Sequence, residues 1–166
     1  MRHAILLFVP LVLSFTGCQI VGEEEPAPEI AAAVYAQRTC GPTDGPALEL
    51  IVLDSVLACE NVNQLGYGDN SDRAFTRIFL WGLGEPAPGV WTVGGIDDDP
   101  SYYSGGWGQS CPGSGAACVN TERAVVSFTA AGADSFAVTA QITLPGGRHQ
   151  NVAAGLRVCP VQILCG

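Results

Sequence analysis

Lysine is absent from this chain of 166 residues, and all seven basic residues are arginines. Sixteen acidic residues outnumber them, so the formal net charge at pH 7 is -9. Nucleic acid requires a basic protein face against its phosphates, and anionic lipid surfaces attract polybasic segments. The charge balance therefore excludes nucleic acid as an expected partner, and it excludes adhesion to anionic lipid through a basic patch.

Histidine is also scarce, since the chain contains only His3 and His149. His149 lies in the turn-like sequence PGGRHQN, which favours a solvent-facing residue over a catalytic base. The sequence PGSGAA lacks the G-x-S-x-G spacing of a nucleophile elbow. No C-x-x-C pair is present, which argues against a zinc site. We therefore assign no catalytic residue, no metal ligand and no cofactor.

The chain lacks an apolar run of the ~20 residues that cross a bilayer as a helix. Its longest run is AILLFVPLVLSF, residues 4–15, which Pro10 interrupts. A short polar start precedes this run and two small residues follow it, which is the three-part layout of a secretory signal. We therefore predict a signal peptide over residues 1–17, and export out of the cytoplasm.

The sequence FTGC, residues 15–18, resembles the lipobox of bacterial lipoproteins. The resemblance covers about the first twenty residues. It implies that the signal peptide is cut before Cys18, and that Cys18 is acylated and becomes the new N-terminus. Two or three acyl chains, at about 0.8 kcal/mol per buried methylene, would give a lasting membrane anchor. Gln19 stands where lipoproteins retained in the inner membrane of enteric bacteria often have Asp, so the resemblance favours the outer membrane.

An acidic, proline-bearing stretch, QIVGEEEPAPEI, follows the anchor. It has little to bury and many like charges, so we predict an extended tether over residues 18–30. The remainder, residues 31–166, is long enough for one domain with a real core. Its many glycines and prolines favour turns over long helices.

Apolar periodicity predicts strands in this domain. Residues 135–144, SFAVTAQITL, alternate between apolar and polar positions, as a half-buried strand does. Turn sequences join this segment to RAVVSFT before it and NVAAGLRVCPV after it, which predicts an antiparallel meander. Residues 47–53, 73–81 and 89–94 also read as strands, with a hairpin loop between the last two, and residues 31–38 suit a strand or a helix. The predicted fold is all-β: a disulfide-stabilised antiparallel β-sandwich or small barrel of about six to seven strands.

Six cysteines remain after Cys18, an even number in a chain predicted to be exported, so we expect three disulfides. They are Cys40, Cys59, Cys111, Cys118, Cys159 and Cys165. Cys111 and Cys118 bracket the flexible PGSGAA and should pair locally. Cys159 and Cys165 read as parts of one terminal strand, where six residues span ~20 Å, too far for a bond between them. They should therefore pair with Cys40 and Cys59, in an order that the sequence leaves open.

The segment 95–118 reads as an unusually long glycine-rich loop, and such loops are often functional. It carries Tyr102, Tyr103 and Trp107, whose rings can stack on sugars or on a partner protein. The alternative is that these rings fold back as a lid over the core. Acidic residues at 97–99, together with Asp69 and Asp72, offer oxygens for Ca²⁺, although Asp-rich turns are usually only turns.

These features favour a lipid-anchored, extracytoplasmic binding or structural module of the cell envelope. Its candidate binding residues are Tyr102, Tyr103 and Trp107, and an envelope glycan or protein is the expected partner. The alternative hypothesis is a small envelope hydrolase that uses carboxylates of the 95–118 region. An enzyme requires a concave pocket with convergent polar groups, whereas a binding module can use an exposed aromatic surface.

Overall fold

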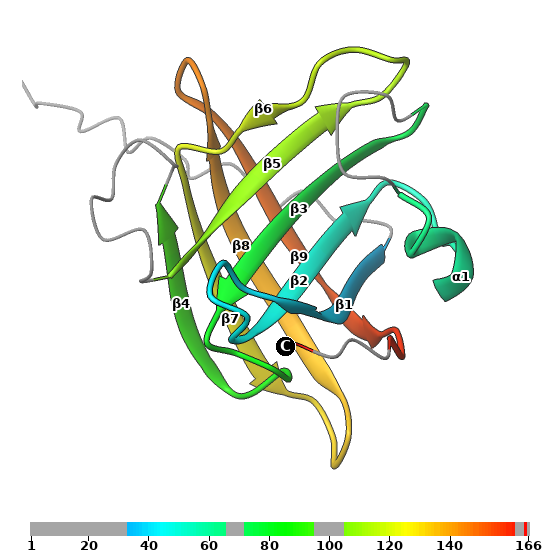
Figure 1. Ribbon diagram of the computed structural model, residues 1–166, viewed down its shortest axis with the longest axis vertical. Coiled ribbons are helices and arrows are strands. Elements are labelled where there is room, and N and C mark those ends of the chain that lie inside the picture. Colours follow the sequence, from blue (N-terminus) through cyan, green and yellow to red (C-terminus); the bar gives the residue numbers. More distant parts are fainter. Residues whose placement is uncertain (1–32, 66–71, 95–104, 162–164, 166) are drawn as a thin grey trace, which may run out of the picture.

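The computed structural model describes residues 33–65, 72–94, 105–161 and 165. Within these ranges one nine-stranded sheet curls into a half-barrel, accompanied by one short helix (Figure 1). The elements are β1 (Ala33–Cys40), β2 (Pro46–Leu53), α1 (Cys59–Val62), β3 (Ala74–Trp81), β4 (Gly89–Gly94), β5 (Gly106–Pro112), β6 (Val119–Asn120), β7 (Arg123–Ala130), β8 (Phe136–Leu144) and β9 (Arg148–Val158). The all-β prediction is confirmed.

The strand order is β4-β7-β8-β9-β1-β2-β3-β5-β6, and all neighbours are antiparallel except β1 and β9. Those two strands pair in parallel over residues 34–36 and 156–158. The predicted sandwich or small barrel of about six to seven strands, all antiparallel, is therefore wrong in two respects: the described residues form nine strands, and one neighbouring pair is parallel. The parallel pair joins segments that are far apart in the sequence, and local periodicity carries no information about such a contact.

The curl of the sheet has a simple cause in the chain. Strand β6 ends the order at one edge, and β7 lies next to the other edge, yet only Thr121 and Glu122 separate them. Asn120 and Arg123 are three residues apart along the chain, so their Cα atoms lie at most about 11 Å from each other, and the sheet must bend until its edges approach. The backbone N–H of Thr121 donates to the carbonyl of Gly108, and that of Glu122 donates to the carbonyl of Thr143. This crossing ties β5 to β8.

The main core fills the inside of the curl. Val138, Ala140 and Ile142 of β8 point into it, as the alternating pattern predicts. They meet residues of the opposite wall such as Leu50 and Ile78. Antiparallel pairing of β7, β8 and β9 confirms the predicted meander.

A second, smaller core lies on the outer face of β1, β2 and β3. Tyr35, Ile51 and Phe75 pack there with Val62 of α1. The Tyr35 hydroxyl donates to the carbonyl of Leu57 and accepts from its backbone N–H, both at 2.7 Å. Strand β2 has the main core against one face and this second core against the other, so nearly every residue of β2 is buried.

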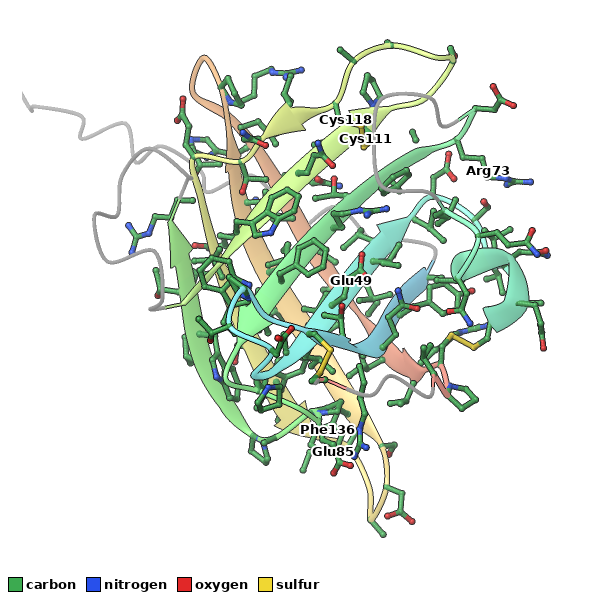
Figure 2. All side chains as sticks on the ribbon, viewed as in Figure 1. Glu49, Arg73, Glu85, Cys111, Cys118 and Phe136 are labelled. Carbon is green, nitrogen blue, oxygen red and sulfur yellow. A yellow bond between two sulfur atoms is a disulfide. The ribbon has the colours of Figure 1, made fainter. Side chains whose placement is uncertain are left out.

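Three disulfides join the six downstream cysteines, as expected. Cys111 pairs with Cys118 across the β5–β6 turn (Figure 2), while the other two bridges are Cys40–Cys165 and Cys59–Cys159. They fasten the end of the domain to its beginning across 125 and 100 residues of sequence. The reading of one strand through Cys159 and Cys165 is wrong, because β9 ends at Val158.

Two further local predictions are corrected. Strands β3 and β4 do not form a hairpin, because β3 pairs with β2 and β5 whereas β4 pairs with β7. The segment 95–118 is not one long loop, because its residues 106–112 form β5 on the edge of β3. Its glycines leave β5 without an alternating apolar pattern, so the sequence did not predict a strand there.

Within the described ranges the α1 helix has four residues, and no membrane-spanning helix is present.

Candidate functional site

Trp107 lies on the outer face of β5, directly opposite Phe79 of β3. The two rings stack, with centroids 4.8 Å apart and planes inclined by 18°. Phe79 is only 4% exposed, whereas Trp107 is half-buried. Trp107 therefore covers Phe79 with one face and keeps part of its own surface accessible to solvent.

The glycines beside Trp107 explain how its strand approaches β3 so closely. Gly106 has φ of +135°, a conformation that favours glycine, and a Cβ there would lie 1.7 Å from the carbonyl oxygen of Phe79. At Gly108, a Cβ would lie 2.6 Å from Oγ1 of Thr121 on the neighbouring segment. The sequence GWG thus places a large ring on the outer face and no side chain at all on the inner face.

A hollow of about 340 Å³ lies beside this aromatic pair. Its lining, which we call the aromatic hollow, is formed by Thr39, Cys40, Gly41, Pro42, Phe79, Trp81 and Trp107. Three rings from two adjacent strands form one wall, and the end of β1 with the following turn forms the other. The Cys40–Cys165 disulfide attaches that turn to the end of the domain. The volume lies near the lower end of the range for small-ligand pockets.

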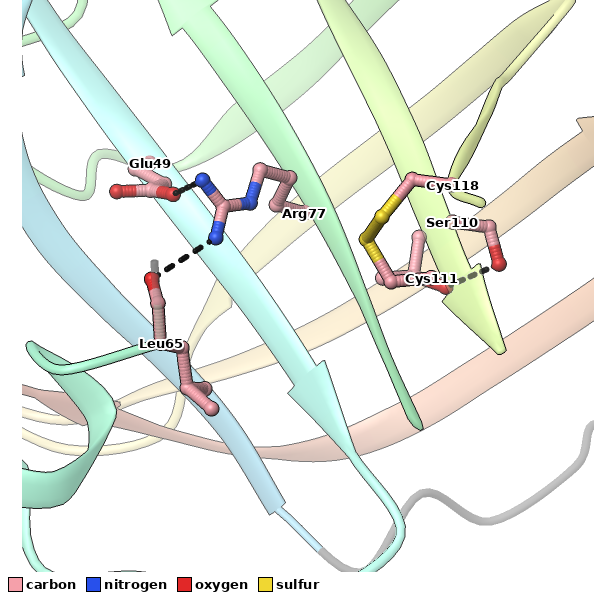
Figure 3. Close-up of a disulfide and its surroundings, with 7 residues drawn as sticks. Glu49, Leu65, Arg77, Ser110, Cys111 and Cys118 are labelled. Atoms are coloured by element: carbon pink, nitrogen blue, oxygen red, sulfur yellow. Dashed lines mark hydrogen bonds and ion pairs between the residues drawn. A yellow bond between two sulfur atoms is a disulfide. The ribbon is translucent and has the colours of Figure 1, made fainter. Parts of the chain in front are cut away.

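A buried polar cluster adjoins the aromatic pair on the same face of the sheet. The register places Gln37, Glu49, Phe79 and Trp107 in one row across four strands. Glu49 accepts a hydrogen bond of 2.6 Å from the Gln37 amide, and its other oxygen lies 3.6 Å from Nη1 of Arg77. Arg77 in turn donates to the carbonyl of Leu65 at 3.1 Å (Figure 3).

Glu49 and Arg77 are each only 1% exposed, so this pair is removed from water. Burial raises the pKa of Glu49 above its ordinary value, and the Gln37 hydrogen bond and the Arg77 charge oppose that rise. The pair lies on the outer face of β2 and β3, where neighbouring side chains cover it from solvent. We therefore assign it a structural role: it supports the cross-strand row of residues that ends at Trp107.

The predicted site residues fall into two groups. Trp107 lies within the described residues. One face of its ring packs on Phe79, as the lid alternative expected, and part of the ring stays accessible, as a binding residue requires. Cys18, Tyr102, Tyr103 and the acidic residues at 97–99 lie outside the described residues. The described part of that segment, residues 105–118, contains no carboxylate. In the described ranges no three His, Cys, Asp or Glu side chains gather in a possible metal site.

Sequence reasoning missed Phe79 and Trp81, although a signal was present. In the sequence RAFTRIFLW the apolar and aromatic residues occupy both faces of the strand. One face carries Thr76 and Ile78 into the curl, while Phe79 and Trp81 lie on the other. Two rings on the outer face of a strand indicate either a second packing layer or a binding surface.

Fold and disulfides define this chain as a disulfide-stabilised all-β protein. No protein-family model matches it, and comparisons with curated proteins and with solved structures give no significant match.

Proposed function

We propose that this protein is a binding module of the bacterial cell envelope, anchored by lipid at Cys18, whose aromatic hollow binds sugar rings of an envelope glycan. The stacked, half-exposed Trp107 beside Trp81 is the observation that carries the proposal. Aromatic faces stack on the apolar faces of sugars, and they lose little side-chain entropy on binding. A partner protein that inserts a ring or an aliphatic side chain is the alternative occupant.

Rigidity supports this function. Phe79, Trp81 and Trp107 project from paired strands, and the opposite wall is attached by a disulfide. A site that is ordered before the ligand arrives avoids much of the entropy loss of binding. Thr39 and the 40–42 turn line the hollow with the rings, and we propose that their polar groups bind sugar hydroxyls.

Placement outside the cytoplasm rests on the signal-like residues 1–17 and on the lipobox-like FTGC. Three disulfides are consistent with an oxidising compartment. In this proposal residues 18–30 serve as a tether that carries the domain away from the bilayer, and the outer membrane is the proposed location.

Binding is tested by titrating the purified protein with soluble fragments of cell-wall glycan while following tryptophan fluorescence. Trp107→Ala and Trp81→Ala should each weaken binding by roughly 0.5–1.5 kcal/mol, about two- to tenfold. Trp91→Phe is the matched control, because Trp91 packs edge-on against Phe128 at the main core, away from the hollow. Circular dichroism must show that each variant is folded.

Wild-type affinity in both hollow variants would refute the aromatic hollow as the glycan site. Glycan fragments that fail to bind, together with a cross-link from Trp107 to an envelope protein, would favour the protein partner instead.

Anchoring is tested separately. Cys18→Ser should abolish labelling by radioactive palmitate and release the protein from the membrane fraction. If the Ser variant remains in the detergent phase, the lipoprotein proposal is wrong while the binding proposal stands.

A further inference from the structure

A second cavity, of about 450 Å³, opens at the end of β3 remote from the aromatic hollow. It lies among the ends of β2, β3 and β5 and the hairpin that joins β8 to β9. We call it the barrel mouth. The interior beneath it is lined by hydrophobic side chains such as Val34, Leu50 and Ile142. Polar side chains at this end therefore break an otherwise apolar inner surface.

Three of these polar side chains meet across the interior. Thr76 of β3 lies opposite Ser110 of β5, and their hydroxyl oxygens are 3.2 Å apart. The Thr76 hydroxyl also lies 3.0 Å from the amide oxygen of Gln150, which belongs to β9 on the other half of the curled sheet. Thr76 is only 3% exposed. These groups form a neutral floor that can donate and accept hydrogen bonds.

Among the residues that the structure describes, the rim of the barrel mouth carries one charge of each sign. Arg148 begins β9, Asp54 follows β2, and both are exposed and line the cavity. Neither makes an ion pair with any other residue that the structure describes. His149 and Asn151 also line the cavity, and Nδ1 of His149 is 3.5 Å from the Thr143 hydroxyl.

The opposite charges of Arg148 and Asp54 should discriminate between ligands according to the charge that each ligand carries. A simple anion would be attracted by Arg148 but repelled by Asp54, and a simple cation would meet the reverse. A ligand with both charges satisfies both residues, because the planar guanidinium of Arg148 suits a carboxylate and the Asp54 carboxylate suits an ammonium group. Pockets that bind small molecules often occupy the mouths of β-barrels and combine apolar walls with a few convergent polar groups.

We propose that the barrel mouth binds a zwitterionic small molecule of amino-acid to dipeptide size. Arg148 holds its carboxylate and Asp54 its ammonium group, while Thr76, Ser110 and Gln150 receive the polar groups that enter deepest. The site is separate from the aromatic hollow, so it does not depend on glycan binding.

Isothermal titration calorimetry on the full-length protein in detergent tests the proposal. The probes are L-serine, L-glutamine and alanylalanine, together with N-acetylated and C-amidated forms of each, glucose, and inorganic phosphate. At least one zwitterion should bind, and loss of either of its charges should weaken binding about tenfold or more, as expected for charge-assisted hydrogen bonds.

Variants assign the site. Arg148→Gln and Asp54→Asn should each weaken the zwitterion about tenfold, and Ser110→Ala should weaken it by a smaller factor. Matched controls are Arg38→Gln and Asp134→Asn, which alter exposed charges beside a separate cavity at the other end of the sheet. Trp107→Ala should leave this binding unchanged, which separates it from the aromatic hollow.

Three results would overturn the proposal. They are no heat with any zwitterion, binding of phosphate or glucose in preference to the zwitterions, and zwitterion binding that survives both rim substitutions.

Discussion

Replacement of Arg77 by Met should destabilise the protein strongly at neutral pH and much less in acid. Methionine retains an apolar stem against Phe75, whose ring lies 4.8 Å from the guanidinium carbon. It removes the positive charge that lies 3.6 Å from the Glu49 carboxylate, and both side chains are buried. At an effective dielectric constant of about 20, two unit charges at that separation attract by about 4–5 kcal/mol. Removal of one partner of a buried pair typically costs about 3–5 kcal/mol.

The pH dependence identifies Glu49 as the cause. Burial already raises the pKa of Glu49 in the folded protein, although the Gln37 hydrogen bond and the Arg77 charge lower it in part. A carboxyl whose folded pKa exceeds its unfolded pKa binds more protons when folded. Its contribution to stability therefore falls as pH rises from the unfolded value through the raised one. Without Arg77 that pKa should rise further, so the loss should become steeper and extend to higher pH.

Urea titrations between pH 5 and pH 8 measure this effect as a difference between variant and wild type. A second variant, Arg77→Met with Glu49→Gln, should recover most of the stability at pH 8, because no buried charge is then left alone. The hydrogen bond from Arg77 to Leu65 is lost in both variants, so it adds a penalty that does not depend on pH. A destabilisation that is the same at pH 5 and pH 8, or a double variant as unstable as the single one, would refute this reasoning.

Three other outcomes are expected. Cys59→Ala with Cys159→Ala should lower the free energy of unfolding by roughly 3–4 kcal/mol in the chain-entropy model, as urea titration measures, because the remaining Cys40–Cys165 bridge limits the opened loop to the segments 40–59 and 159–165. Gly108→Ala should lower it by about 1–3 kcal/mol, since the new methyl would lie 2.6 Å from Oγ1 of the buried Thr121, whereas Gly155→Ala, which meets nothing within 4 Å, is its control. Non-reducing mass spectrometry of the natively folded domain should detect no free thiol among the six downstream cysteines, and rapid alkylation of any of them would contradict the three bridges.

Several local elements of this protein could be predicted from the amino-acid sequence. Strict alternation over residues 135–144 predicted β8 because a strand turns successive side chains to opposite faces. The short spacing between Cys111 and Cys118 was enough to predict their bridge, and excess turn residues excluded long helices. Strand β5 was not predicted, because GGWG has no periodic apolar pattern. Its extended conformation depends on pairing with β3.

How those elements assemble depends on contacts between distant parts of the chain. The parallel contact between β1 and β9 and the curl of the sheet bring Thr76 to within a hydrogen bond of Gln150, 74 residues away. The register of β3 and β5 sets Phe79 beneath Trp107, and the outer face of the neighbouring strands β2 and β3 buries Glu49 beside Arg77. Periodicity reports which face of a strand is apolar, but each of these contacts depends on which strands become neighbours and in what register. Strand order and register depend on the free energy of the whole sheet, so the candidate sites could be identified only from the folded structure.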